Sequence, residues 1–271
     1  MRVPCEHLGT AVQLDPYAKR IVSLSSGLTE ALFEMGYADR VVGVSPYCSR
    51  YADCTGIPVA GSYLHIDYPV LKDLDADVIL LTSGIQLALA RSLSAKGYPV
   101  YVVPLPASVW DIAGNSIRVS SLCGDAEPGR ALAELMITEL ITPERKISED
   151  GPLVYAEAWF GVHPRTIGGA SFIHDIIRWA GGRPLFGSSP FSYGELNLSA
   201  TAEAKPDVFL GFHEPDHPVD FAGLSRERGW DELFSPGIIT SDITKGRNII
   251  HDGPSLVETV RWLQESFAPL S

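Results

Sequence analysis

The chain contains two segments that repeat one pattern: an apolar run, a turn of small polar residues, and an amphipathic stretch that ends at glycine. The first spans Arg20–Gly36 and is followed by a further apolar run at Val41–Val44; the second spans Leu153–Gly182. Such a pattern predicts a strand that leads into a helix, so each segment opens one half of an α/β chain. Because two similar α/β halves commonly hold a ligand in the cleft between them, the doubling indicates binding before it indicates catalysis.

The alternation of apolar runs and helical patterns predicts two Rossmann-like lobes with parallel sheets. In the first half, a short hairpin in residues 1–19 precedes strands at Arg20–Leu24, Val41–Val44, Val78–Leu81 and Val100–Val103, with helices at Leu28–Met35, Pro69–Leu74 and Ile85–Lys96. In the second half, strands are expected at Leu153–Ala158, Val208–Gly211 and Gly237–Thr240, with helices at Ser171–Ala180, Ser199–Ala204 and Pro254–Phe267.

Two further helical patterns, Ser108–Leu122 and Arg130–Ile141, lie between the halves. The polar stretch that follows them contains proline and glycine, which indicates a boundary. The predicted division is therefore an N-terminal α/β lobe at 1–107, a helical connector at 108–150 with a backbone helix at 127–141, and a C-terminal α/β lobe at 151–271.

Charge and hydropathy exclude two classes of partner. The formal net charge is −12 and no run of lysines or arginines occurs, so no nucleic-acid footprint is expected. No stretch reaches the roughly 18 to 20 apolar residues that membrane insertion requires. The first residues lack the apolar core of a secretory signal. This leaves two localisations open: a cytoplasmic protein, or a periplasmic one from which a signal was removed. A monomer is expected.

Catalytic and metal motifs are missing from the sequence. No G-x-S-x-G, P-loop or G-x-G-x-x-G motif follows a predicted strand. We therefore expect that the chain is not an enzyme and that it carries no cofactor. The four cysteines include no C-x-x-C pair. They are expected to be free thiols, with a Cys48–Cys54 disulfide as the alternative. His213 and His217 are the only candidate metal pair, but Pro215 and Pro218 predict a loop there rather than a helix, and no metal site is expected.

The order of several segments resembles that of the class III, or helical-backbone, substrate-binding proteins of ABC importers. The resemblance rests on Arg20–Phe33, Val41–Ser45, Leu71–Leu80, Ile173–Phe186, Ala204–Val208, Thr240–Asp242 and the C-terminal helix. Members of this family bind cobalamin, siderophores or haem, and the cobalamin-binding members are the most similar in pattern. The resemblance implies two lobes joined by a single long helix, a ligand cleft between them, and delivery of a metal chelate to an ABC permease.

Aromatic residues are the main candidates for ligand contact, because aromatic rings cover the flat face of a corrin or haem at low entropic cost. The resemblance places Tyr47 and Tyr51 in an aromatic loop and Tyr63 in the cleft. It places Tyr193 near the position where cobalamin-binding members carry a tryptophan in the second lobe. Trp159 and Phe160 follow the end of a predicted strand. The alternative for each ring is ordinary packing in a loop or core.

Polar candidates accompany these rings. Ser26 lies at a predicted helix N-terminus, where free N–H groups bind anions, although plain N-capping at Ser26 or Ser171 explains the pattern equally well. Arg165 and Arg247 are suited to ligand carboxylates or phosphate, or are ordinary surface residues. Asp242 lies in the segment Thr240–Asp242 that carries part of the resemblance.

We therefore predict a solute-binding protein for a metal chelate, with cobalamin or another corrinoid first and a ferric siderophore or haem next. For haem, Tyr63 would ligate ferric iron as a phenolate. The alternative from a different class is a cytoplasmic sensor or metal-dependent enzyme that uses His213, His217 or Asp242. The family's docking glutamates align near Pro69 and at Ser199, which carry no charge; Asp67, Glu195 or Glu203 would substitute after a shift of register.

Overall fold

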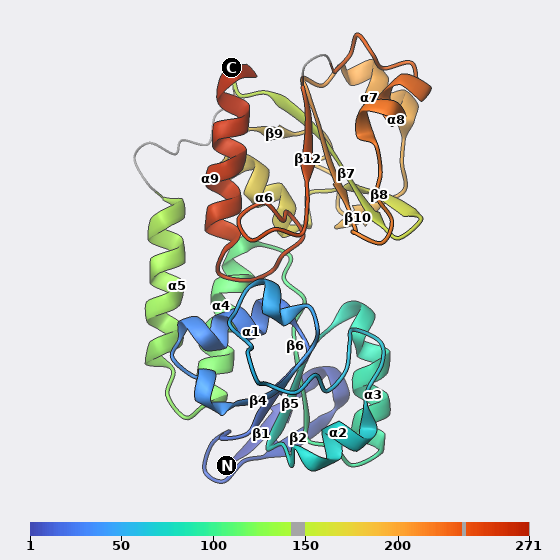
Figure 1. Ribbon diagram of the computed structural model, residues 1–271. Coiled ribbons are helices and arrows are strands. Elements are labelled where there is room, and N and C mark those ends of the chain that lie inside the picture. The colour runs from blue at the N-terminus through green and yellow to red at the C-terminus, as the bar shows by residue number, and fades with distance from the viewer. Residues whose placement is uncertain (142–149, 235–236, 271) are drawn as a thin grey trace. The chain divides into compact units, whose positions relative to one another are not determined.

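A computed structural model describes residues 1–141, 150–234 and 237–270 (Figure 1). The chain clusters into two compact units. Unit 1 comprises Met1–Pro106, Trp110–Ile137 and Asp252–Pro254, and unit 2 comprises Ala107–Val109, Thr138–His251 and Ser255–Ser271. The expected connector is divided between the units, and residues 142–149 of it lie outside the described part. The three-part division and the cleft between lobes stay predictions.

Unit 1 is built on a parallel sheet with the strand order β4-β3-β5-β6. The strands are β3 (Ile21–Ser23), β4 (Val41–Val44), β5 (Val78–Thr82) and β6 (Val100–Val103), each within two residues of its predicted position. Their side chains are almost all buried, which explains the runs of valine, isoleucine and leucine. The predicted N-terminal hairpin is also confirmed, as β1 (Arg2–Cys5) paired antiparallel with β2 (Thr10–Gln13).

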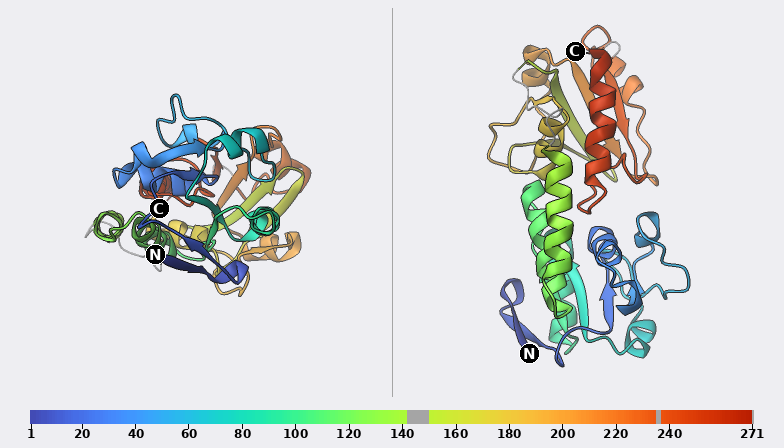
Figure 2. Two further views of the ribbon diagram at one scale, coloured as in Figure 1. Left: turned by 90° about the horizontal axis from the view of Figure 1, so that it is seen from below. Right: turned by 90° about the vertical axis from the view of Figure 1, so that its left-hand side faces the viewer.

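Helices alternate with the strands of unit 1, as the sequence predicts: α1 (Ser26–Glu34), α2 (Tyr68–Asp73) and α3 (Leu87–Ala95). After β6 the chain forms α4 (Val109–Leu122) and α5 (Glu127–Leu140), which Figure 2 shows lying side by side. A Cβ atom on Gly129 would lie 2.6 Å from the carbonyl oxygen of Ser116, so this glycine allows the close approach of the two helices. With 14 residues, α5 is about 21 Å long.

The sheet of unit 2 is mixed. Its described strands follow the order β10-β8-β7-β11-β12, and β9 (Arg183–Pro184) pairs with β7. The predicted strands are confirmed as the parallel set β7 (Leu153–Phe160), β11 (Val208–His213) and β12 (Ile238–Ser241). Two antiparallel strands, β8 (His163–Ile167) and β10 (Tyr193–Gly194), were not predicted from the sequence. Gly161, with φ +60°, makes the two-residue turn between β7 and β8 possible.

Four helices are described in unit 2: α6 (Phe172–Trp179), α7 (Leu198–Ala204), α8 (Phe221–Glu227) and α9 (Leu256–Phe267). Helices α6 and α9 lie on one side of the sheet, and α7 and α8 lie on the other (Figure 1). On the α8 side the core is an aromatic cluster of Tyr155, Phe209, Phe221, Trp230 and Phe234. The sequence analysis missed α8, which is only seven residues long.

Among the residues described, no helix has both the length and the apolar character needed to cross a membrane.

Candidate functional site

The carboxyl ends of the parallel strands define one edge of each sheet, which we call the carboxyl edge of the unit. In open α/β sheets this edge is where ligands bind. In unit 1 the edge is formed by the segments after β3, β4, β5 and β6, beginning at Leu24, Ser45, Ser83 and Pro104. The predicted site residues Ser26 and Tyr47 lie in the first two of these segments.

Tyr47 and Tyr63 form an aromatic pair in unit 1. Their ring centroids are 5.4 Å apart with an interplanar angle of 37°, and both side chains are half-buried. Tyr63 reaches this position because a bridge between Gly61 and Ile66 closes the short loop that carries it. The guanidinium of Arg50 lies 5.1 Å from the centre of the Tyr47 ring. The structure thus brings together two of the predicted aromatic residues.

The Tyr63 phenol is held in its neutral form. Burial, and then the nearby carboxylate of Asp252, raise its pKa, while a hydrogen bond with Ser26 works in the opposite direction. Ser26 is therefore a partner of Tyr63 and the first residue of α1. The N-cap is Ser25, so the alternative that Ser26 caps this helix is wrong. At Ser171 the alternative of a plain N-cap is confirmed, because its hydroxyl accepts a hydrogen bond from the Ile173 N–H.

Tyr51 and the neighbouring cysteines are buried. Tyr51 is only 7% exposed, so it offers little surface to a ligand. Cys48 and Cys54 are free thiols, which excludes the alternative of a disulfide in this structure. The Thr29 hydroxyl donates to Cys48 Sγ at 3.1 Å. Burial raises the pKa of the Cys54 thiol to about 11, so this thiol stays protonated at neutral pH.

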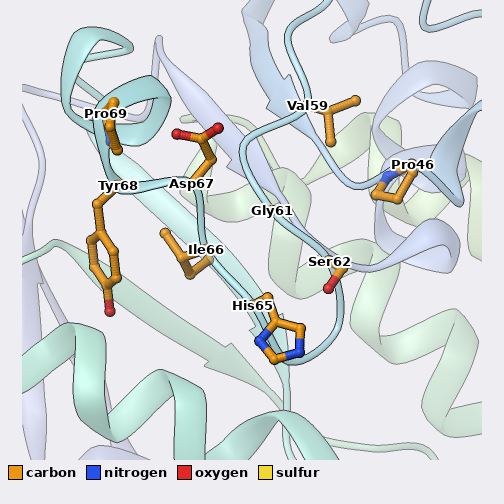
Figure 3. A pocket seen from close by; sticks show the side chains of 9 residues that line it. All are labelled: Pro46, Val59, Gly61, Ser62, His65, Ile66, Asp67, Tyr68 and Pro69. Carbon is orange, nitrogen blue, oxygen red and sulfur yellow. The ribbon is translucent and has the colours of Figure 1, made fainter.

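A pocket of about 540 Å³ lies in unit 1 (Figure 3), and its lining residues do not include Tyr47 or Tyr63. Its lining comes from the turn after β4, from the loop that leads into α2 and from the first turn of α2: Pro46, Val59, Gly61, Ser62, His65, Ile66, Asp67, Tyr68 and Pro69. Asp67 is the N-cap of α2 and accepts a hydrogen bond from the Val70 N–H at 3.1 Å. This pocket was not predicted from the sequence, because it depends mainly on the path of an irregular loop.

In unit 2 the aromatic candidates Trp159 and Phe160 lie in a strand. The expectation that they sit beyond its end is wrong, because β7 continues to Phe160 and pairs with β8. As neighbours in a strand they point to opposite faces of the sheet. Phe160 packs edge-to-face against Tyr193, with ring centroids 5.5 Å apart and an angle of 85°. Trp159 packs against the aromatic cluster on the other face.

The polar candidates of unit 2 lie in β8 and in the loop after β12. Arg165 pairs with Ala158 across the hairpin, and its guanidinium donates to the Pro164 carbonyl at 2.9 Å. The Asp242 carboxylate accepts a hydrogen bond from the Thr244 N–H at 2.7 Å, which shapes the loop at the carboxyl edge. Arg247 is exposed in the same loop. Their contact with a ligand stays a prediction.

His213 is the last residue of β11, and residues 214–217 after it form a loop, as the prolines predict. The His213 ring stacks on Phe221 with centroids 6.1 Å apart, and the Glu214 carboxylate accepts the Gly161 N–H at 2.8 Å. His217 is exposed. In the part of the chain that the structure describes, no three histidine, cysteine, aspartate or glutamate side chains are grouped so as to hold a metal ion.

A buried ion pair in unit 2 was missed by the sequence analysis. Glu157 in β7 is fully buried, and Arg228 binds both of its carboxylate oxygens, at 2.8 and 3.0 Å. The same carboxylate accepts the Tyr155 hydroxyl at 2.5 Å and the Trp159 indole N–H at 2.8 Å. One signal was present, because a glutamate in the middle of an apolar strand is buried only when it is paired.

Two sheets with helices on their faces, each carrying aromatic residues near its carboxyl edge, define an α/β protein of the binding-protein class. The chain belongs to the Periplasmic binding protein family, which matches residues 21–232. Its relatives include the "Cobalamin-binding protein" of Halobacterium salinarum, which is 23% identical over 208 residues. That match covers 74% of this chain and only 56% of the relative.

Solved structures of other binding proteins share the fold at low sequence identity. A possible iron-binding (periplasmic solute-binding) protein from Staphylococcus epidermidis has a TM-score of 0.77 at 18% identity, covering 92% of this chain and 98% of that one. The periplasmic heme-binding protein RhuT from Roseiflexus sp. RS-1 has a TM-score of 0.75 at 20% identity, with coverage of 93% and 99%. The likeness confirms the predicted fold.

Proposed function

We propose that this protein is a non-enzymatic solute-binding protein for a metal chelate with broad, flat faces, and that corrinoids such as cobalamin are its first ligand class. The observation that carries the proposal is the pair of half-buried aromatic rings in each unit, Tyr47–Tyr63 and Phe160–Tyr193. Tilted or edge-on ring pairs offer a stiff apolar surface that loses little side-chain entropy when a ligand covers it. Membership of the Periplasmic binding protein family and the cobalamin-binding relative support the same class.

The environment of Tyr63 favours a corrinoid over haem. Ligation of ferric haem iron by tyrosine uses the phenolate, whereas burial and the Asp252 carboxylate both raise the pKa of the Tyr63 phenol. A neutral phenol hydrogen-bonded to Ser26 is better suited to contact with a ligand that brings its own complete set of metal ligands. Haem, which the Roseiflexus neighbour binds, is therefore the second ligand class.

A thermal-unfolding screen tests the proposal. Cyanocobalamin, haemin and a ferric hydroxamate siderophore are each added to the purified protein, with a neutral disaccharide as the control solute. At about 100 times its dissociation constant, a ligand stabilises the folded state by about 2.7 kcal/mol, which corresponds to a rise of about 5 °C in Tm for a chain of this size. We expect this rise with cyanocobalamin and none with the disaccharide. No rise with any of the three chelates contradicts the proposal.

Replacing Tyr63 with phenylalanine separates the corrinoid from the haem reading. The substitution keeps the ring that packs on Tyr47 and removes only the hydroxyl. We therefore expect cyanocobalamin affinity to stay within about tenfold of the wild type, since a hydrogen bond of this kind contributes about 0.5–1.5 kcal/mol. Absorbance titration measures both ligands. A haemin Soret shift that is present in the wild type and in the buried-tyrosine control Tyr51→Phe, but lost in Tyr63→Phe, would instead identify haem bound through a Tyr63 phenolate.

The partner that we propose is an ABC permease, to which the protein would deliver the chelate. The positions where the family's docking glutamates align, Pro69 and Ser199, lie in the first turns of α2 and α7. Neither carries a charge. The alternative carboxylates Glu195 and Glu203 are exposed on unit 2, and Asp67 is exposed but caps α2.

We therefore expect weak docking to a cobalamin-type permease. Charged contacts accelerate association and lose strength as salt is added, so their absence predicts little salt dependence. The measurement is stimulation of the ATPase activity of a reconstituted permease by the liganded protein. Strong stimulation that is abolished by Glu195→Ala or Glu203→Ala, and left intact by the exposed control Glu227→Ala, would show that these carboxylates dock the protein.

A further inference from the structure

The proposed function leaves one buried charged group of unit 2 without a role. Glu157 has no exposed surface, and only 11% of the Arg228 side chain is exposed. The guanidinium also lies 5.1 Å from the centre of the Trp230 ring, on the aromatic cluster. An ion pair in such surroundings stabilises a fold no better than apolar residues of the same size, because both ions lose their hydration. Stability alone therefore gives no reason for an ion pair at this position.

The hydrogen bonds of the Glu157 carboxylate connect side chains along strand β7, from the buried core to the end of the strand. Tyr155, Glu157 and Trp159 alternate along β7, so their side chains share one face of the sheet. One carboxylate oxygen accepts from the Tyr155 hydroxyl and Arg228 Nη1, and the other accepts from the Trp159 indole N–H and Arg228 Nη2. Arg228 thus orients the carboxylate, and the carboxylate in turn fixes the indole.

Trp159 is the residue of this network that reaches the carboxyl edge. It pairs with His213, the last residue of β11, and it is partly exposed, whereas Tyr155 is fully buried. A tryptophan side chain has two rotatable bonds, and the N–H···O bond to Glu157 removes freedom about both. The ring is therefore held in one orientation before any ligand arrives.

We propose that Glu157, oriented by Arg228, is a positioning residue that fixes the Trp159 indole as a preformed aromatic wall for the chelate. The inference rests on the proposed function, since it assigns Trp159 to the ligand surface of unit 2. Ordering a mobile side chain on binding weakens affinity by roughly two- to tenfold, so fixing the ring in advance improves affinity by that factor. Cyanocobalamin is the probe, because its corrin presents the flat face that an indole covers.

Three variants separate positioning from general stability, with cyanocobalamin affinity measured by calorimetry and stability by thermal unfolding. Trp159→Phe keeps an aromatic ring and removes the N–H, and Glu157→Gln replaces one of the two acceptor oxygens by a donor. Tyr155→Phe is the matched control, because it removes a bond to the same carboxylate on the side away from Trp159. We expect a fivefold to tenfold loss of affinity in the first two variants, and a lower Tm with unchanged affinity in Tyr155→Phe.

The outcomes distinguish this inference from the proposed function. If the wild type binds cyanocobalamin, and both Trp159→Phe and Glu157→Gln bind it with an affinity within twofold of the wild-type value, the positioning role is wrong and the proposed function stands. Equal losses of affinity in all three variants would also overturn it, because they would follow stability rather than the indole bond. If the wild type binds none of the three chelates, the proposed function fails and this inference fails with it.

If Glu157→Gln does not fold, a measurement on the wild type tests whether the Trp159 indole is held in one orientation. The chain has five tryptophans, so the protein is labelled with 5-fluorotryptophan and the Trp159 resonance is assigned with Trp159→Phe. We expect one narrow ¹⁹F resonance for Trp159 without ligand, which shifts when cyanocobalamin saturates the protein. A broad or multiple Trp159 resonance before ligand is added, or no shift at saturation, contradicts the inference.

Discussion

Replacing Arg228 with methionine is expected to lower the free energy of unfolding by about 3–5 kcal/mol, because it leaves the Glu157 carboxylate buried without its cation. Arg228 supplies two of the four hydrogen bonds to that carboxylate, and no part of Glu157 reaches solvent. Methionine fills a similar volume, so the loss measures the unpaired charge rather than a cavity. Urea unfolding followed by circular dichroism gives the value.

The control for this result is Arg226→Met, two residues earlier in α8. Arg226 lies 3.8 Å from Asp220, and the two side chains are 61% and 72% exposed, so this pair is screened by water and its loss is expected to cost about 0–1 kcal/mol. The double variant Glu157→Leu/Arg228→Met removes both charges and should recover much of the loss. A cost below about 1 kcal/mol for Arg228→Met would show that the buried pair is not a structural element of unit 2.

The second large effect is expected on ligand affinity when one ring is removed from each aromatic pair. Tyr47→Ala takes away the partner of Tyr63, and Phe160→Ala takes away the partner of Tyr193. A half-buried ring that a chelate covers contributes about 1.4 kcal/mol, which is tenfold in affinity. If the two contributions add, the double variant binds cyanocobalamin about 100-fold more weakly than the wild type.

Tyr98→Ala is the matched control for this double variant. Tyr98 is also half-buried and also lies beside another tyrosine, with its ring centroid 6.3 Å from that of Tyr68. It precedes β6, however, and so lies at the opposite edge of the sheet from the segments where ligands bind. We expect Tyr98→Ala to bind cyanocobalamin with wild-type affinity, as measured by calorimetry. Equal weakening in Tyr98→Ala, or less than threefold weakening in the double variant, would show that the aromatic pairs are not the ligand surface.

Most of the fold could be predicted from the sequence because buried parallel strands have a strong compositional signal. The four strands of unit 1 are runs of β-branched residues bounded by small polar ones, and each was placed to within two residues. In unit 2 the signal failed where strands are half-exposed. Strand β8 reads His-Pro-Arg-Thr-Ile, and β10 is only two residues long, so neither shows an apolar run. Both are antiparallel and depend on a tight turn and on pairing with a neighbouring strand.

The candidate site was predicted less completely, because its geometry depends on contacts between distant parts of the chain. Tyr47 and Tyr63, both predicted from the sequence, contact each other, and their contact with a ligand stays a prediction. The hydrogen bond between Tyr63 and Ser26 joins segments 37 positions apart. Tyr51 was predicted from the same loop as Tyr47 and is buried. The bond between Glu157 and Arg228 spans 71 positions, and no local sequence pattern predicts that Arg228 is the partner of Glu157.

Calorimetric titration of the wild-type protein with cyanocobalamin measures directly whether this chain binds a metal chelate. We expect one chelate bound per chain with a dissociation constant of about 1 μM or lower, which corresponds to about −8 kcal/mol. Haemin and a ferric hydroxamate siderophore, titrated under the same conditions, rank the chelate classes. Saturable binding of any one of them supports a chelate-binding protein, and absence of binding by all three at tens of micromolar protein would contradict it.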